Sequence, residues 1–229
     1  MSTQITYHGH SCFSIVSDGK HLLIDPFLTG NPTAKIAAAQ LKPDFILLSH
    51  GHGDHVGDTV AIAKRTGCLV VCNFEISSWL GKQGVANIHP LHIGGGNRFL
   101  FGRCKMTIAH HGSGLPDGAY GGNPAGFLLK LNDGKTIYFS GDTALTYDMK
   151  WLAEEKVDVA ILCVGDNFTM GPDDALKAIR LFEPKTVIPC HYGTWPYIDI
   201  DVEEFQARCQ AETAAACALL HAEESFSVA

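Results

Sequence analysis

The chain has 229 residues, 46% of them hydrophobic, and a formal net charge of −7 at pH 7, which together fit one large domain or two small ones with a sizeable core. The acidic charge argues against nonspecific binding to nucleic acid or anionic lipid, and no apolar run approaches the roughly 20 residues that cross a bilayer. The N-terminus lacks the pattern of a secretory signal and the eight cysteines form no CxxC pair, so we expect a cytoplasmic protein with reduced, mostly buried thiols.

Strands and helices alternate in the first part of the chain, after an initial hairpin. The turn of this hairpin is Ser17-Asp18-Gly19-Lys20, and its Asp-Gly pair is typical of a tight connection between strands. Apolar patterning predicts strands at 4–7, 12–16, 21–24, 45–49 and 68–72. It predicts helices at 34–40, 55–65 and 75–82.

The middle of the chain has the pattern of a β-meander, and the last third alternates helices with strands. The expected meander strands are 98–101, 105–109, 125–131 and 135–140. The later expected elements are helices at 147–155, 172–182 and 202–211 and strands at 157–164 and 186–190. No short repeat or linker divides the sequence, so we expect a single domain over 1–229, built as a sandwich of two mixed sheets with helices outside.

The segment Ser49-His50-Gly51-His52-Gly53-Asp54-His55 follows an apolar strand and holds three imidazoles and one carboxylate. These groups are the usual protein ligands of zinc, iron and manganese. Residues two apart on extended backbone point the same way, so His50 and His52 can reach one ion. Asp54 is expected at a helix N-cap with His55 opening the helix, which directs this pair at a second point. The motif therefore predicts two ions.

Three other apolar strands also end in metal-binding side chains. These endings are His110-His111, Asp142 and His191. In layered α/β folds the loops at the carboxyl edge of a sheet build the site. A single histidine after a strand carries little information, but four such endings together predict one metal centre.

The sequence resembles the metallo-β-lactamase superfamily, whose fold is a four-layer αβ/βα sandwich, and within it a group of metal-dependent hydrolases similar to the L-ascorbate-6-phosphate lactonases. HGHGDH matches the HxHxDH signature of the superfamily. The other matching motifs are Gly9-His10-Ser11-Cys12-Phe13, Leu23-Ile24-Asp25-Pro26, Gly141-Asp142-Thr143, Gly165-Asp166-Asn167-Phe168-Thr169-Met170-Gly171 and His191-Tyr192-Gly193-Thr194.

The resemblance implies a ligand set for each of two divalent ions. His50, His52 and His111 would bind the first ion. Asp54, His55 and His191 would bind the second, and Asp142 would bridge the two. His110 is the alternative to His111, because the group usually has a serine after its middle histidine and this chain has Gly112 there.

Two such ions, roughly 3.5–4 Å apart, support hydrolysis of a carbonyl or phosphoryl bond by metal-bound hydroxide. Zinc is the first choice for this donor set, with manganese, iron and nickel as alternatives. We expect Asp54 to act catalytically by orienting the hydroxide. His10 is a candidate catalytic acid or a support for a ligand, with a structural hydrogen bond as the alternative. Asp25 is expected to orient a ligand histidine, with a turn carboxylate as the alternative.

Hydrolysis of a small-molecule ester, lactone or phosphoester is the function these features favour, without nucleic acid or membrane partners. One alternative is a phosphodiesterase or nuclease, although relatives of that kind carry a clamp domain or basic exosite. The other is a non-hydrolytic di-iron or metal-binding protein, although redox relatives have Glu in place of His52.

Two further features leave alternatives open. Residues 112–124 contain five glycines and two prolines and form either a mobile lid over the substrate or a long surface loop. Relatives of this group often assemble, so a homo-oligomer is an alternative to a monomer.

Overall fold

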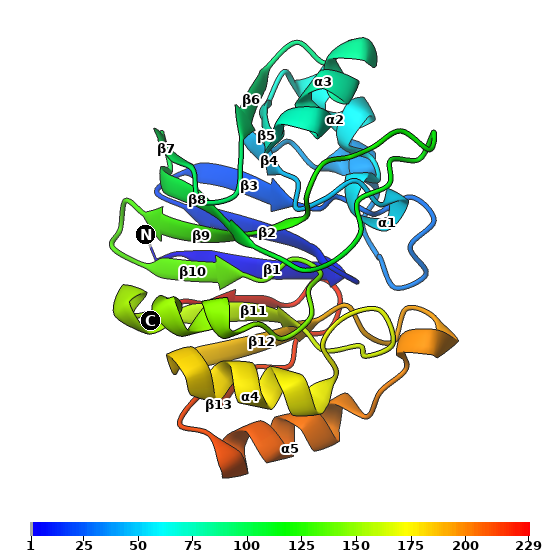
Figure 1. The fold of residues 1–229 in the computed structure, drawn as a ribbon. Helices are drawn as coiled ribbons and strands as arrows, with labels where there is room; N and C mark the ends of the chain where they lie inside the picture. Colours follow the sequence, from blue (N-terminus) through cyan, green and yellow to red (C-terminus); the bar gives the residue numbers. More distant parts are fainter. Residues whose placement is uncertain (1) are drawn as a thin grey trace.

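Two seven-stranded sheets face each other in the computed structural model, which describes residues 2–229 (Figure 1). The first sheet has the order β14-β1-β2-β3-β4-β5-β6. Its strands are β1 (Gln4–Gly9), β2 (Cys12–Ser17), β3 (Lys20–Ile24), β4 (Phe45–Leu47), β5 (Leu69–Asn73), β6 (Ile88–Leu91) and β14 (Ser225–Ser227). Neighbours from β3 to β6 run parallel, and β14, β1, β2 and β3 pair antiparallel, so this sheet is mixed.

The second sheet repeats this plan with the order β13-β12-β11-β10-β9-β8-β7. Its strands are β7 (Gly96–Phe99), β8 (Gly102–Ile108), β9 (Ala125–Leu131), β10 (Thr136–Phe139), β11 (Val159–Cys163), β12 (Thr186–Cys190) and β13 (Ala216–Cys217). The meander β7 to β10 is antiparallel, whereas β10 to β13 are parallel.

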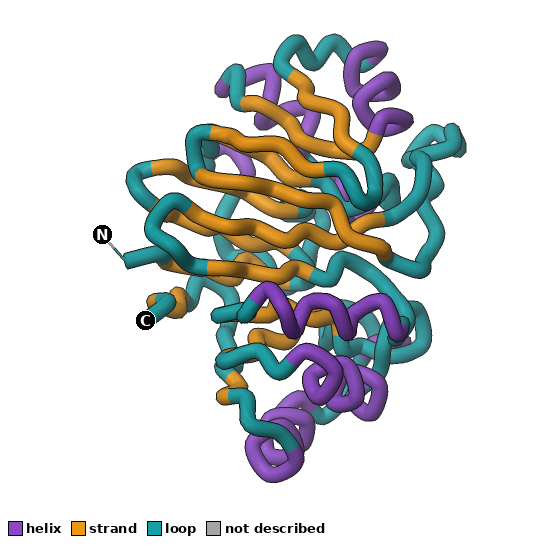
Figure 2. Tube along the Cα trace, turned by 60° about the vertical axis from the view of Figure 1, so that its left-hand side comes forward, coloured by secondary structure: helices purple, strands orange, loops and turns teal. Residues whose placement is uncertain are grey.

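Helices cover the outer face of each sheet (Figures 1 and 2). The first sheet carries α1 (Gly53–Val56), α2 (Thr59–Thr66) and α3 (Phe74–Lys82), and the second carries α4 (Pro172–Phe182), α5 (Val202–Glu212) and the 3₁₀ helix η2 (Tyr147–Glu155). The expected four-layer sandwich is therefore confirmed. No helix within residues 2–229 has both the length and the apolar character needed to span a bilayer.

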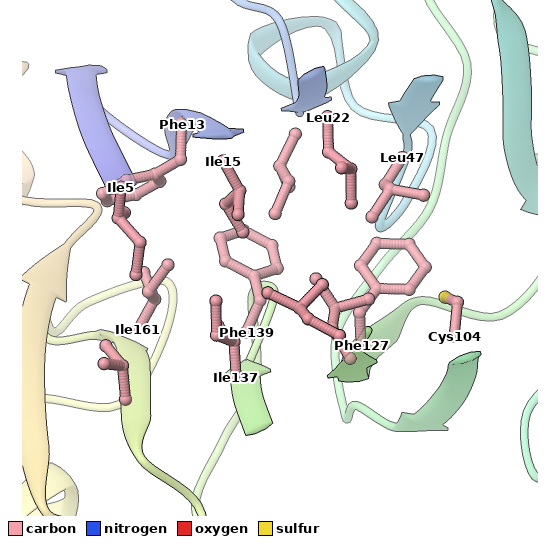
Figure 3. Close-up of a cluster of buried hydrophobic side chains, with 14 of the residues drawn as sticks. Ile5, Phe13, Ile15, Leu22, Leu47, Cys104, Phe127, Ile137, Phe139 and Ile161 are labelled. Atoms are coloured by element: carbon pink, nitrogen blue, oxygen red, sulfur yellow. The ribbon is translucent and has the colours of Figure 1, made fainter. Parts of the chain in front are cut away.

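The main core fills the space between the sheets. Ile5 and Phe13 of the first sheet and Phe127, Phe139 and Ile161 of the second are buried in one cluster (Figure 3). Separate clusters lie between each sheet and its helices. Since both faces of the central strands are buried, their continuous apolar runs follow directly from the layering.

The structure corrects two expected helices. Within residues 34–40, only Ala38–Gln40 is helical, as a short 3₁₀ turn. Before residue 34, the Asn31 side chain accepts hydrogen bonds from the backbone N–H and the hydroxyl of Thr33, which favours a turn there. The helix expected at 55–65 is divided between α1 and α2. Gly57 divides it with a φ of +40°, where an added Cβ would lie 2.3 Å from the Pro26 carbonyl oxygen.

Candidate metal centre

The predicted site residues lie where strands of both sheets end. The loops after these strands gather on the right-hand side of Figure 1. The seven predicted ligands follow β4, β8, β10 and β12 and are His50, His52, Asp54, His55, His111, Asp142 and His191. One local expectation is wrong, because α1 begins at Gly53 with His52 as its N-cap. Asp54 therefore lies in the first turn of the helix and not at its cap.

A first group of ring nitrogens comes from His50, His52 and His111, each offering an atom within 4.8 Å of the others. His50 is buried, while His52 and His111 are half-buried and face an open cavity. The adjacent His110 is exposed and belongs to none of the candidate groups in the described residues 2–229. The geometry thus brings His111, and not His110, into the cluster.

A second group comprises Asp54, His55 and His191, again with atoms within 4.8 Å of one another, and His10 lies within the same distance. His55 and His191 are buried, and the Asp54 side chain is 26% exposed. Burial alone would raise the pKa of Asp54, but its hydrogen bond with His10 and the nearby His55 ring lower it below the usual range. Asp54 is therefore a charged ligand candidate at the cavity surface.

Asp142 lies between the two groups. Its Oδ2 is 2.9 Å from His191 Nε2 and 3.3 Å from His55 Nε2 in the second group. The same oxygen is 3.6 Å from His111 Nε2 and 3.9 Å from His50 Nε2 in the first. Although burial opposes ionisation, the His55 and His191 rings hold the pKa of Asp142 well below its usual range. One charged oxygen thus faces both groups.

Several polar atoms of this centre have no hydrogen-bond partner among residues 2–229. They are His55 Nε2, Asp142 Oδ1 and His191 Nδ1, all buried. Leaving such an atom unpaired costs roughly 1–3 kcal/mol. His55 is the clearest case: its Nδ1 donates to Asp25 at 2.8 Å, and its Nε2 faces the carboxylate oxygens of Asp54 and Asp142. Although burial opposes it, Asp142 and Asp25 hold the pKa of this ring well above its usual value, so the position attracts positive charge. A cation held between these atoms would supply that charge, so the residues fit a divalent metal ion.

Asp25 supports one histidine of each group. Its Oδ2 accepts from His55 Nδ1, and it also accepts the Ser49 hydroxyl proton at 2.5 Å. Because Ser49 donates to Asp25, its oxygen is free to accept from His50 Nδ1 at 2.9 Å. Both rings thereby use Nδ1 as the donor and direct Nε2 at the centre, which is the support expected of a carboxylate behind metal ligands.

His10 lies behind Asp54. Its Nε2 donates to Asp54 Oδ2 at 3.1 Å, and its Nδ1 accepts from the Thr194 hydroxyl at 2.8 Å. Burial lowers the pKa of His10 to about 4, against the opposing effect of Asp54. His10 does not line the cavity. The geometry therefore favours the expected support of a ligand over the role of a substrate-facing acid.

Backbone strain collects at the same place. His10, Asp25 and His191 have φ values of +57°, +42° and +57°, in the left-handed region that non-glycine residues rarely adopt. The His191 backbone N–H donates to the His10 carbonyl at 2.8 Å, which joins two of these residues directly. Such strain is typical of functional sites, where surrounding structure must hold it in place.

An open cavity of about 230 Å³ lies over the centre. Its lining comprises His52, Asp54, His111, Asp142, Phe168, His191 and Trp195. The sequence assigned no role to Ser49, Thr194 or Trp195. Ser49 and Thr194 stand at the ends of motifs already noted and Trp195 follows one, but nothing in a single sequence separates a side chain that supports a ligand from one that only packs beside it.

The loop at 112–124 is tied to the body of the molecule. Ser113 Oγ accepts from the Gly51 N–H and donates to the Gly121 carbonyl. The Asn73 side chain donates to the same carbonyl, and Leu115 is buried against the outer core of the first sheet. The base of the loop is therefore anchored next to the HGHGDH turn, while Tyr120, which pairs with Gly114 across the loop, is 70% exposed.

Comparison with known proteins gives a consistent result. The model of a family described as "Beta-lactamase superfamily domain" matches residues 4–191. A UPF0173 metal-dependent hydrolase of Bacillus mycoides is 52% identical over 213 residues, covering 90% of this chain and 92% of the relative. Another, from Pelotomaculum thermopropionicum, is 47% identical over 230 residues, covering 98% and 100%.

Among solved structures, Igni18, a metallo hydrolase from the archaeon Ignicoccus hospitalis, superimposes with a TM-score of 0.89 at 32% identity. The match covers 99% of this chain and 98% of that one. The shared fold therefore extends over nearly the whole length of both proteins.

Proposed function

Since this chain belongs to the UPF0173 metal-dependent hydrolases of the β-lactamase superfamily, we propose that it is a binuclear hydrolase of small-molecule esters, lactones or phosphoesters. Two divalent ions, zinc before manganese, iron or nickel, are the proposed cofactors. His50, His52 and His111 would hold one ion, Asp54, His55 and His191 the other, and Asp142 both.

The observation that carries this proposal is the position of Asp142 Oδ2, within 4 Å of ring nitrogens from both histidine groups. A structural site needs only one closed set of ligands. Two adjacent sets that share a carboxylate and open onto a cavity are the arrangement expected for catalysis.

Divalent ions bound there would lower the pKa of water and polarise a substrate oxygen. The protein's own contribution is positioning. Asp25 fixes the tautomers of His50 and His55, while His10 holds one oxygen of Asp54 and leaves that carboxylate on the cavity surface. Asp54 is thereby suited to accept a hydrogen bond from a reacting water at the cavity floor.

The test is metal analysis together with a panel of chromogenic lactones, esters and phosphodiesters, applied to the wild type and to His50→Ala. We expect about two ions per chain in the wild type and loss of hydrolysis in His50→Ala. The matched control is His110→Ala, a change at an exposed histidine beside the cluster, which should keep both metal and activity. Full activity in a folded His50→Ala protein would refute the mechanism.

A further inference from the structure

The cavity over the metal centre has two chemically distinct sides. Five of its seven lining residues are the proposed ligands His52, Asp54, His111, Asp142 and His191. The remaining two are Phe168 and Trp195. In the proposed reaction, the bond that breaks would lie against the ligand side of the cavity. The part of a bound substrate that does not react would therefore face the aromatic rings.

Both aromatic residues are part of larger contacts. The centroid of the Trp195 ring is 6.1 Å from that of Phe27 and 4.9 Å from that of His10. These two rings pack against Trp195 and hold it in place. Phe168 lies 6.2 Å from Tyr197 and is 54% exposed. An apolar ligand group that covered Phe168 would remove apolar surface from water, which is favourable in proportion to the area buried.

The charge of the cavity points in the same direction. None of its lining residues is a lysine or arginine, and two are carboxylates. Recognition of a phosphate usually requires such cationic side chains. Lys177 and Arg208 line a different hollow, at the start of α4, together with three aspartates. A phosphate carried away from the reacting bond would thus have no cationic side chain to bind it.

The size of the cavity limits the ligand. Its volume of about 230 Å³ is below the roughly 300–1,000 Å³ of pockets that enclose drug-sized ligands. A single ring or a short alkyl chain beside the reacting group matches this space.

We infer that the substrate is a neutral ester or lactone with an apolar or aromatic substituent, selected by Phe168 and Trp195, and not a phosphorylated molecule. This inference rests on the proposed function. In the reaction, the oxygen of one water bonds to the carbonyl carbon and the bond from that carbon to the leaving oxygen breaks. The leaving oxygen takes a proton of the same water, so an ester gives a carboxylic acid and an alcohol, and a lactone gives a single hydroxy acid.

The experiment compares three lactones with the zinc-loaded protein: γ-butyrolactone, its γ-phenyl derivative and its γ-(phosphooxymethyl) derivative. Acid release gives kcat/KM for each. We expect the wild type to prefer the phenyl lactone over the unsubstituted one by about tenfold or more, and to hydrolyse the phosphorylated one least. Phe168→Ala should reduce the phenyl preference by about tenfold, and Phe168→Leu should restore part of it. Tyr147→Ala is the control, because Tyr147 is 82% exposed and does not line the cavity.

A binding measurement separates this inference from the proposed function. Calorimetry with phenylacetate and acetate reports the apolar contact without turnover, and the preference for phenylacetate should fall in Phe168→Ala and persist in Tyr147→Ala. Retained binding preference without hydrolysis of any lactone, ester or phosphodiester of the panel would refute the proposed function and keep the apolar site. Preference for the phosphorylated lactone, or a phenyl preference that Phe168→Ala leaves unchanged, would overturn the inference itself.

Discussion

The two sheets of the sandwich contribute to the metal centre in different ways. The first sheet provides four predicted ligands from one turn after β4, and hydrogen bonds with Asp25, Ser49 and His10 hold three of them, His55, His50 and Asp54. The second sheet provides three ligands from three separate strand ends. Two of these, Asp142 and His191, keep buried atoms without partners among the described residues, as does His55 of the first sheet at its Nε2. The rear atoms of His50 and His55 in the first half are thus held by hydrogen bonds, whereas His191 Nδ1 and Asp142 Oδ1 in the second half have no such partner.

The largest effect is expected from removing the negative charge of Asp142, which lies between the two histidine groups. Asp142→Asn takes away the one negative oxygen that faces both histidine groups, so we expect loss of at least one ion per chain and a fall in kcat of roughly a thousandfold or more. Metal analysis and hydrolysis rates measure this change. Asp18→Asn, in the exposed β2–β3 turn, is the control. Unchanged metal content in Asp142→Asn would show that this carboxylate does not bridge.

Removing the metal should expose the difference between the halves. If the ions are present at about a thousand times their dissociation constant, chelation costs about 4 kcal/mol of stability and lowers the melting temperature. Hydrogen exchange should rise more at 109–113, 140–144 and 190–194 than at 49–55, where hydrogen bonds to Asp25 and Ser49 remain. Equal exchange in both parts would contradict the contrast between the two sheets.

The smallest of these effects is expected from a change of Asp25, the carboxylate that supports the ligands of the first sheet. Asp25→Asn keeps the shape of the side chain but weakens acceptance from His55 and Ser49, so metal affinity should fall 10- to 100-fold. A competition titration with a chelating dye measures this affinity. Asp44→Asn is a suitable control, because the Asp44 side chain is exposed and, among residues 2–229, contacts Lys20 and the His21 backbone but none of the predicted ligands. A larger loss from Asp25→Asn than from Asp142→Asn would reverse the expected order.

The site was more predictable from the sequence than the irregular parts of the fold were. The clustering of the predicted ligands could be anticipated because each follows an apolar strand, and strand periodicity is a local property. The supports of the ligands were harder, since the contact of Thr194 with His10 joins residues 184 positions apart. Strand β6 was missed because it is a partly exposed edge strand containing Pro90. β13 and β14, of two and three residues, are too short to show a period.

The shared position of Asp25 has a thermodynamic consequence. This carboxylate holds His55 directly and His50 through Ser49, so one buried group supports a predicted ligand of each of the two proposed ions. Binding of an ion through His50 or through His55 would act on the same carboxylate, so the two metal affinities would be linked, and the linkage would be reciprocal. Filling of one position should therefore change the metal affinity of the other.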